Sequence, residues 1–291
     1  STAIFLRLLI LIEKTIIDAL KFYCCFCNHI DYKLILYSIC MFIDAHCHLD
    51  VLEKEGVSIG EAIIRARKAK VGIIVVNGVN PRHNRSILAL AVQSPEVQAA
   101  LGMYPIDALQ LSEQEIDDEI DFLRRRKKDF VAVGEIGLDL KEESLIEGFG
   151  RQKKILEKFV NLAIELDKPV IVHSRKAELE TIELLEKLGA KKVVMHCFSG
   201  NMKLVDRIFK NGWCLSIPAN VKYSEQFQEV VKRVPIENLF CETDSPYLHP
   251  DKKWPNEPAL VVESYKNIAK IKGLSLKEVE KKIEENYERL F

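Results

Sequence analysis

Short apolar segments alternate with amphipathic segments along most of the chain. After residue 41, short runs rich in Val and Ile recur, and a stretch with helical spacing of apolar residues follows each of them. This alternation predicts a strand and a helix in turn. The predicted strands cover residues 42–48, 72–77, 97–102, 131–136, 169–173, 193–197, 213–217 and 239–243.

The helical segments between these strands carry their own signals. Between the fourth and fifth strands, apolar residues repeat at helical spacing from Ile155 to Leu166, and Ser275 with Glu278 matches a capping box that opens a last helix. Alternating strands and helices imply a parallel sheet, and eight such units favour an α/β fold closed into a (β/α)8 TIM barrel. No glycine-rich motif follows the first strand, which argues against a dinucleotide-binding fold.

The first 40 residues differ from the rest. They are apolar, but charged residues interrupt them too often for the ~20 apolar residues of a membrane span, and no small-residue cleavage site follows an apolar core. A membrane-surface anchor is the alternative interpretation. We expect residues 1–40 to be an atypical apolar extension that is not part of the native protein, and residues 41–291 to be the barrel domain, whose length fits the roughly 250 residues of one barrel.

Composition narrows the class of protein. Of 291 residues 48% are hydrophobic, which excludes intrinsic disorder, and the formal net charge of −1 means that any nucleic-acid contact is local. The eight cysteines lack the spacing of a disulfide framework and indicate a reduced, cytoplasmic protein. Because no long apolar run is present, we expect no stable membrane association.

Polar residues gather where the predicted strands end. A lone His or Glu at a strand end is more often structural than functional, but barrel enzymes carry their chemistry at this end. Several such groups in one barrel mouth would lack partners unless metal ions bound them. The six residues are His46, His48, Glu135, His173, His196 and Asp244.

Four imidazoles and two carboxylates suit a pair of divalent ions. One carboxylate can bridge two metals with its two oxygens, and Glu135 is the expected bridge. Two ions contribute +4, which two carboxylates and one bound hydroxide reduce to about +1, so the site would attract an anion such as phosphate.

Five ordered motifs carry a family resemblance. The segments FIDAHCHLD, VGEIGLD, PVIVHSR, MHCFSG and ETDSPYLHP, the last followed by NEP, resemble the TatD-type metal-dependent hydrolases, a family of amidohydrolase-like barrels described as deoxyribonucleases. The resemblance implies that His46, His48 and Asp244 hold one ion, that His173 and His196 hold the other, and that Glu135 bridges them. Glu135 takes the place of the carbamylated lysine that often bridges metals in related barrels.

Substrate contacts are predicted less directly. Where many members of that family read G-x-H-P, this chain has Tyr104, a far weaker acid than imidazolium. Tyr104 remains a candidate hydrogen-bond donor to substrate, and Arg82 and Arg175 are candidate phosphate contacts. The alternative for the two arginines is a solvated surface charge.

Three further residues lie in the predicted loops of the same face. Lys222 is another candidate phosphate contact, with the same surface-charge alternative. Two aromatic residues, Tyr247 and Trp254, follow the eighth strand and lie next to prolines. These two rings are expected to pack, with stacking on a base as the alternative.

The expected activity is metal-dependent hydrolysis of a phosphodiester by an exonuclease-like DNase, with DNA as the partner and substrate. Two divalent ions, Mg, Mn or Zn, would activate a water whose proton Asp244 accepts. Hydrolysis of a small ester, lactone or amide is the alternative within enzymes, and a non-catalytic binding scaffold is the alternative outside them.

Overall fold

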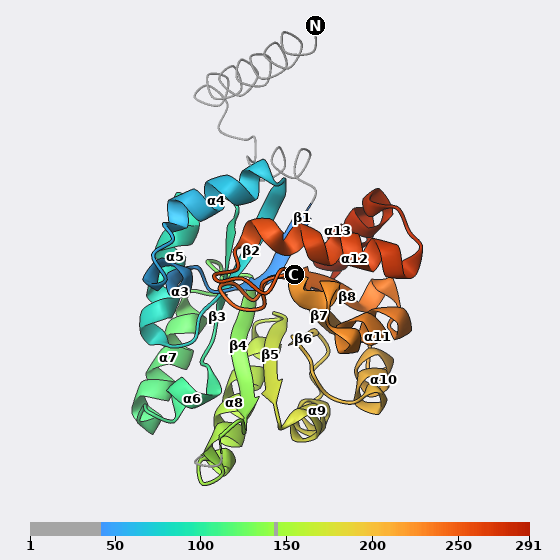
Figure 1. The fold of residues 1–291 in the computed structure, drawn as a ribbon. Coiled ribbons are helices and arrows are strands. Elements are labelled where there is room, and N and C mark those ends of the chain that lie inside the picture. The colour runs from blue at the N-terminus through green and yellow to red at the C-terminus, as the bar shows by residue number, and fades with distance from the viewer. Residues whose placement is uncertain (1–41, 143–144) are drawn as a thin grey trace, which may run out of the picture. The chain divides into compact units, whose positions relative to one another are not determined.

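The computed structural model describes residues 42–142 and 145–291, and element labels follow Figure 1. The predicted extension, residues 1–40, lies outside the described residues. The strands of the described chain are β1 (Phe42–Cys47), β2 (Val71–Asn77), β3 (Val97–Leu101), β4 (Ala132–Asp139), β5 (Val170–Arg175), β6 (Val193–His196), β7 (Cys214–Pro218) and β8 (Leu239–Glu242).

The strands form one parallel sheet in which each strand pairs with the next along the chain (Figure 1). The chain after β8 returns to β1: the Asp244 amide donates to the His46 carbonyl at 2.9 Å, and the His48 amide donates to the Ser245 carbonyl at 2.8 Å. These bonds close the sheet and confirm the (β/α)8 barrel.

Helices connect the strands as the periodicity predicts. The capping box expected at Ser275 and Glu278 is present at the start of α13. The helices are α3 (Leu49–Lys54), α4 (Ile59–Lys68), α5 (Pro81–Gln93), α6 (Pro105–Ala108), α7 (Glu113–Arg125), α8 (Phe149–Glu165), α9 (Glu178–Lys187), α10 (Met202–Lys210), α11 (Glu225–Arg233), α12 (Val261–Lys272) and α13 (Leu276–Leu290), with short 3-10 turns η2 (Ala219–Lys222), η3 (Ile236–Asn238) and η4 (Pro258–Leu260).

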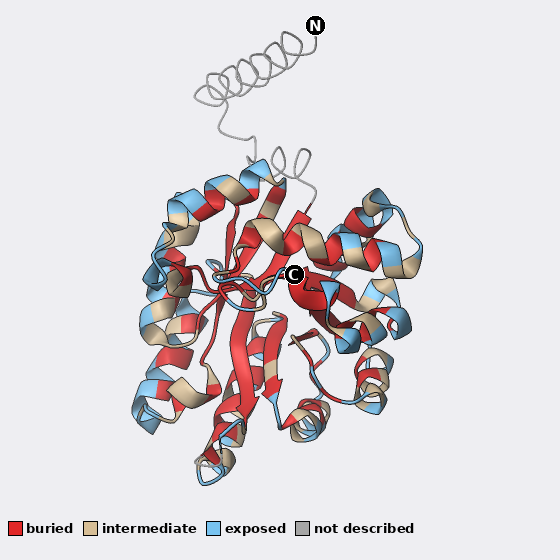
Figure 2. Cartoon of the chain, in the orientation of Figure 1, coloured by how far each residue is buried: buried red, intermediate tan, exposed pale blue. Residues whose placement is uncertain are grey.

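The barrel strands are the core of the protein. Every residue of β1, β3, β4, β6, β7 and β8 is buried, and Figure 2 shows the strands almost wholly in the buried colour. Among these apolar residues, His46, His196 and Glu242 are buried polar groups at or near the ends of their strands, and Glu135 is a buried polar group in the middle of β4. Because all strands are parallel, these groups share the carboxyl end of the barrel.

The strands β4 and β5 extend further than their apolar runs predict. They were expected to end at residues 136 and 173, but β4 continues to Asp139 and β5 to Arg175. The added residues pair with each other, Leu138 with Ser174 and Asp139 with Arg175. Backbone pairing cannot be read from a run of apolar residues, and it places Asp139 within a strand.

No helix in residues 42–142 or 145–291 has the length and apolar content to cross a membrane.

Candidate metal centre

The end of β1 and the residue that follows it supply two imidazoles on one side of the chain, since His46 lies in β1 and His48 is the N-cap of α3. Alternation along the strand turns Cys47 away and brings His46 Nε2 to 3.1 Å from His48 Nε2. The Nδ1 atom of His48 lies 3.2 Å from the Asn77 carbonyl, which can only accept, so Nδ1 donates and Nε2 is the atom that can bind a metal when the ring is neutral. Both rings are buried.

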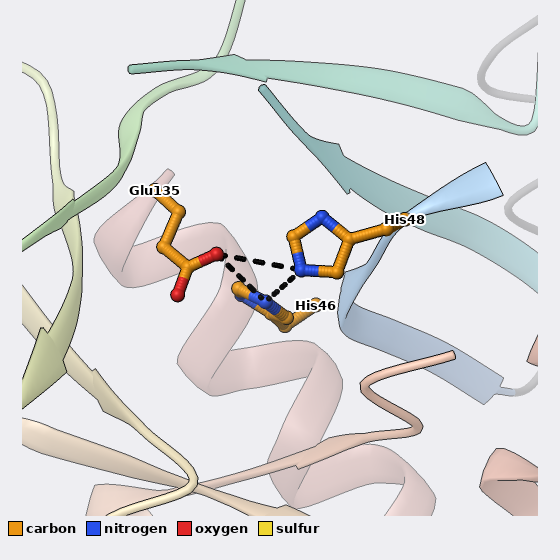
Figure 3. A group of neighbouring side chains, drawn as sticks. All are labelled: His46, His48 and Glu135. Carbon is orange, nitrogen blue, oxygen red and sulfur yellow. Dashed lines mark hydrogen bonds and ion pairs between the residues drawn. The ribbon is translucent and has the colours of Figure 1, made fainter. Parts of the chain in front are cut away.

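Glu135 lies between these imidazoles and a second pair. Figure 3 shows its carboxylate pointing at His46 and His48, whose Nε2 atoms are 3.7 and 3.4 Å from Oε2. Its other oxygen, Oε1, is 3.1 Å from His173 Nδ1 and 3.3 Å from His196 Nε2. One buried carboxylate thus presents one oxygen to each pair of histidines.

The donor atoms of both groups converge closely enough to hold metal ions. His46, His48 and Glu135 form one set, and Glu135, His173 and His196 form another. The two facing nitrogens of His46 and His48 need a proton or a cation between them, since two lone pairs repel each other. Imidazole nitrogens and carboxylate oxygens are ordinary ligands of divalent ions, so the residues fit a metal.

Mutual electrostatics set the charge of these groups. Burial alone would raise the pKa of Glu135, but the hydrogen bonds from His173 and His196 hold that pKa well below its usual range. Burial alone would lower the pKa of His48, but the hydrogen bond and charge of Glu135, with the charge of Asp244, raise it to about 9. The pocket therefore holds its carboxylate ionised and draws positive charge.

Asp244 lies at the rim of the first set. Its Oδ1 is 3.6 Å from His46 Nε2 and 3.7 Å from His48 Nε2, and its side chain is 14% exposed against 4% for Glu135. Burial raises the pKa of Asp244 to about 6, with the charges of Glu242 and Glu135 adding to it against the attraction of His196 and His48. Its φ of 54° lies in the left-handed region, an uncommon conformation that is enriched at functional positions.

Two carboxylates that contact the outer nitrogens of the histidines, Asp139 and Glu242, were not predicted from the sequence. Asp139 Oδ2 accepts from His173 Nε2 at 2.9 Å and from the Tyr104 hydroxyl at 2.8 Å. Glu242 Oε2 lies 3.5 Å from His196 Nδ1 and accepts from the Ser216 hydroxyl. Such partners orient ligating imidazoles and fix their tautomer. The available signal was their place in the GEIGLD and ETD segments at the same end of the barrel.

The predicted substrate contacts are in different surroundings. The Tyr104 hydroxyl is engaged by Asp139, beside the His173 ring. Arg175 ends β5 with an exposed side chain, whereas Arg82 lines a separate cleft together with Asp107 and Asp118. Lys222, another candidate from the sequence, is 2.6 Å from Asp251 and 3.8 Å from Glu263. Of the candidate substrate contacts, Arg175 and Tyr104 are thus the two that lie at the carboxyl ends of β4 and β5.

Comparison with known proteins assigns this arrangement to a family. The family model described as TatD related DNase matches residues 43–291, which includes every described residue except Phe42 and therefore both sets of histidines. The chain belongs to the TatD-related DNase family. The fold and the metal-dependent hydrolase class expected from the sequence are therefore confirmed.

This chain matches relatives of the TatD family over nearly the whole length of those relatives. An uncharacterized metal-dependent hydrolase of Methanocaldococcus jannaschii is 33% identical over 252 residues, covering 86% of this chain and 96% of that protein. Human deoxyribonuclease TATDN3 is 32% identical, covering 86% and 94%. The crystal structure of the TatD homologue YjjV from Escherichia coli superposes with a TM-score of 0.79 at 29% identity, covering 87% and 98%. The chain is accordingly a metal-dependent hydrolase with deoxyribonuclease-like relatives.

Proposed function

We propose that this TatD-family protein hydrolyses phosphodiester bonds of DNA, in the manner of an exonuclease, and that two divalent ions, when bound, would supply the activated water. The observation that carries the proposal is the position of Glu135, with Oε2 facing His46 and His48 and Oε1 facing His173 and His196. A carboxylate between two groups of imidazoles suits a bridging ligand of a two-metal hydrolase.

The proposed ligands follow from the same geometry. His46 and His48, with Asp244 at their rim, would hold one ion, and His173 and His196 the other. A bound pair of divalent ions supplies a water of lowered pKa and charge stabilisation for a phosphoryl group. Mg, Mn and Zn all remain compatible with a mixture of imidazole and carboxylate ligands, so the identity of the metal is an arm of the test.

The protein's own residues then handle the proton and the substrate. Asp244 takes a proton from the attacking water as the new oxygen–phosphorus bond forms, and it returns the proton to the leaving oxygen as the old bond breaks. Its carboxylate is ionised above a pKa of about 6, so it can accept near neutral pH. Arg175 is the proposed phosphate contact at the mouth, and Tyr104 acts through Asp139 and His173.

The test combines metal analysis with a defined substrate. The full chain is stripped of metal, reloaded with Mg, Mn or Zn, and assayed on 3′-labelled single-stranded DNA. Stepwise nucleotide release that requires added metal supports the proposal. If about two ions bind but DNA stays intact while a small ester, lactone or amide is hydrolysed, the DNase assignment is wrong and the metal centre stands.

Metal binding is expected to release protons. In the metal-free protein the pKa of His48 is about 9, so near pH 7.5 this ring is protonated, yet only the neutral ring can bind a metal. Affinity should therefore rise with pH up to about 9, by up to roughly tenfold per unit for one proton released. Calorimetry in buffers with different ionisation enthalpies measures the protons, and a binding enthalpy that is the same in every buffer would contradict this.

Replacing Asp139 by Ala is expected to weaken one ion selectively. His173 loses the acceptor that holds its Nε2–H, so its Nδ1 is no longer fixed toward Glu135. Loss of such a partner typically weakens metal binding about 10- to 100-fold. Tyr104→Phe is the matched milder change, because it removes one donor to Asp139 but leaves the bond to His173. Metal titration that finds two unaltered affinities in Asp139→Ala would show that this contact does not position a ligand.

A further inference from the structure

Positive charge is concentrated at the end of the barrel opposite the metal centre. Three segments that precede neighbouring strands carry it, and together they are named here the basic end. They contain nine basic against three acidic residues, an excess of six positive charges in a chain whose formal net charge is −1. The segments are residues 124–129 before β4, 165–168 before β5 and 187–192 before β6.

The fold brings these three segments side by side. The strands β4, β5 and β6 are parallel neighbours in the sheet, so their amino ends lie next to one another (Figure 1). Lys168 Nζ donates to the Phe130 carbonyl at 2.6 Å, which joins the second segment to the end of the first. Lys192 Nζ donates to the Asp167 carbonyl at 3.0 Å, which joins the third segment to the second. The basic end is therefore one continuous surface.

The acidic residues of the basic end are already paired, so they leave most of its positive charge uncompensated. The pairs are Arg124–Glu165 at 2.8 Å, Arg126–Asp129 at 2.5 Å and Lys192–Asp167 at 2.9 Å. Five further basic side chains are exposed and form no ion pair or side-chain hydrogen bond within the described part of the chain. They are Arg125, Lys127, Lys128, Lys187 and Lys191.

The crowding of positive charge is evident at Lys168. Burial and the charge of Lys192 lower the pKa of Lys168, so the two ammonium groups repel each other. Repulsion among charges of one sign opposes the compact state of a protein. An anion that binds across the basic end would relieve this repulsion.

The composition of the basic end favours a phosphate backbone over a protein partner. Cores of protein–protein interfaces are poor in charge and are built around apolar or aromatic anchors. None of the large apolar side chains that are exposed in the described residues lies within the three segments, and Ile164 of α8 lies just before the second. Lysines and arginines without such anchors are the groups that contact DNA phosphates irrespective of sequence.

We propose that the basic end binds the phosphate backbone of duplex DNA, independently of its sequence, and so tethers the protein to the DNA molecule whose terminus it hydrolyses at the other end of the barrel. This inference rests on the proposed DNase function. Strands of four to eight residues, roughly 15–25 Å long, separate the basic end from the metal centre. A duplex is stiff over about 150 base pairs, so a short duplex cannot contact both ends of the barrel at once.

Binding to a covalently closed duplex circle isolates the basic end, because such DNA has no terminus to enter the barrel mouth. The full chain is stripped of metal so that the DNA stays intact, and the affinity is measured between about 50 and 200 mM salt. We expect Lys127→Gln/Lys128→Gln to weaken binding about tenfold at the lowest salt. The slope of log affinity against log salt should fall by about 2, since two phosphate contacts are lost.

Variants of equal charge separate this surface from the net charge of the protein. Lys187→Gln/Lys191→Gln removes two charges from the third segment and should weaken binding of the circle to a similar degree. Lys270→Gln/Lys277→Gln removes two exposed lysines of α12 and α13 and should bind the circle as wild type does. An equal loss of affinity in all three variants, or wild-type affinity in the first two, overturns the proposal.

Polyglutamate tests the class of partner. A surface that contacts a phosphate backbone should release the circle to an excess of unlabelled duplex DNA and resist polyglutamate of the same total charge. If polyglutamate displaces the circle as effectively as DNA does, the basic end is a general site for acidic chains, such as acidic protein segments, and the DNA assignment is wrong.

Kinetics distinguish failure of the basic end from failure of the DNase function. In the metal-loaded protein, Lys127→Gln/Lys128→Gln should raise KM for linear DNA longer than about 150 base pairs and leave kcat and KM for a short oligonucleotide unchanged. An unaltered KM for long DNA, with DNA still cleaved, removes the tether and keeps the DNase. Binding of the circle that depends on the basic end, without cleavage of any DNA, keeps the surface and removes the proposed hydrolysis.

Discussion

Asp244→Asn is expected to lower kcat by about 10³-fold while leaving most of the bound metal in place. The amide cannot accept the proton of the attacking water, whereas its oxygen can still face His46 and His48 at the distances of 3.6 and 3.7 Å that Asp244 Oδ1 has. Asn also tolerates the left-handed φ of 54°, so the backbone is not strained by the change. Turnover and metal content measured on the same preparation test this directly.

The pH dependence supplies a second readout for this residue. A base must be deprotonated to act, so the rate should rise with pH through the pKa of Asp244, which is about 6 in the metal-free protein and lower beside a cation. The variant should lack this acidic limb. A variant that keeps wild-type turnover, or keeps the limb, would show that another group accepts the proton.

The barrel itself was readable from the sequence for a physical reason. Strands of a closed parallel barrel are buried on both faces, so they appear as nearly continuous apolar runs. The polar interruptions in such runs are then informative, and residues such as His46 and Glu135 were found because each follows apolar strand residues. Closure brings all strand ends together, so residues from distant motifs had to meet.

Contacts that depend on side-chain direction were not readable. Nothing in the spacing shows that Glu135 turns one oxygen to each histidine pair, or that Asp139 and Glu242 support His173 and His196 from behind. The bond from Trp254 to Glu55 joins residues 199 positions apart in the sequence. These interactions arise only after the loops are folded over the barrel end.

Glu135→Gln is expected to impair both ions at once. The change removes the negative charge from between His46 and His48 on one side and His173 and His196 on the other. Breaking a buried charge pair costs about 3–5 kcal/mol, which corresponds to metal binding weaker by roughly 10²-fold to several thousandfold. Metal stoichiometry at a fixed free-metal concentration should therefore fall, and hydrolysis of any substrate should fall with it.

Glu119→Gln is the matched control for this change. Glu119 is also a buried carboxylate, at 1% exposure, but it bonds to Asn84 and Arg85 and touches none of the four histidines. The Glu119→Gln substitution should lower the free energy of unfolding, because a buried hydrogen-bond partner is lost. It should leave the metal content as in wild type. Two ions bound with wild-type affinity in Glu135→Gln would exclude a bridging carboxylate. Loss of only one ion would assign Glu135 to a single site.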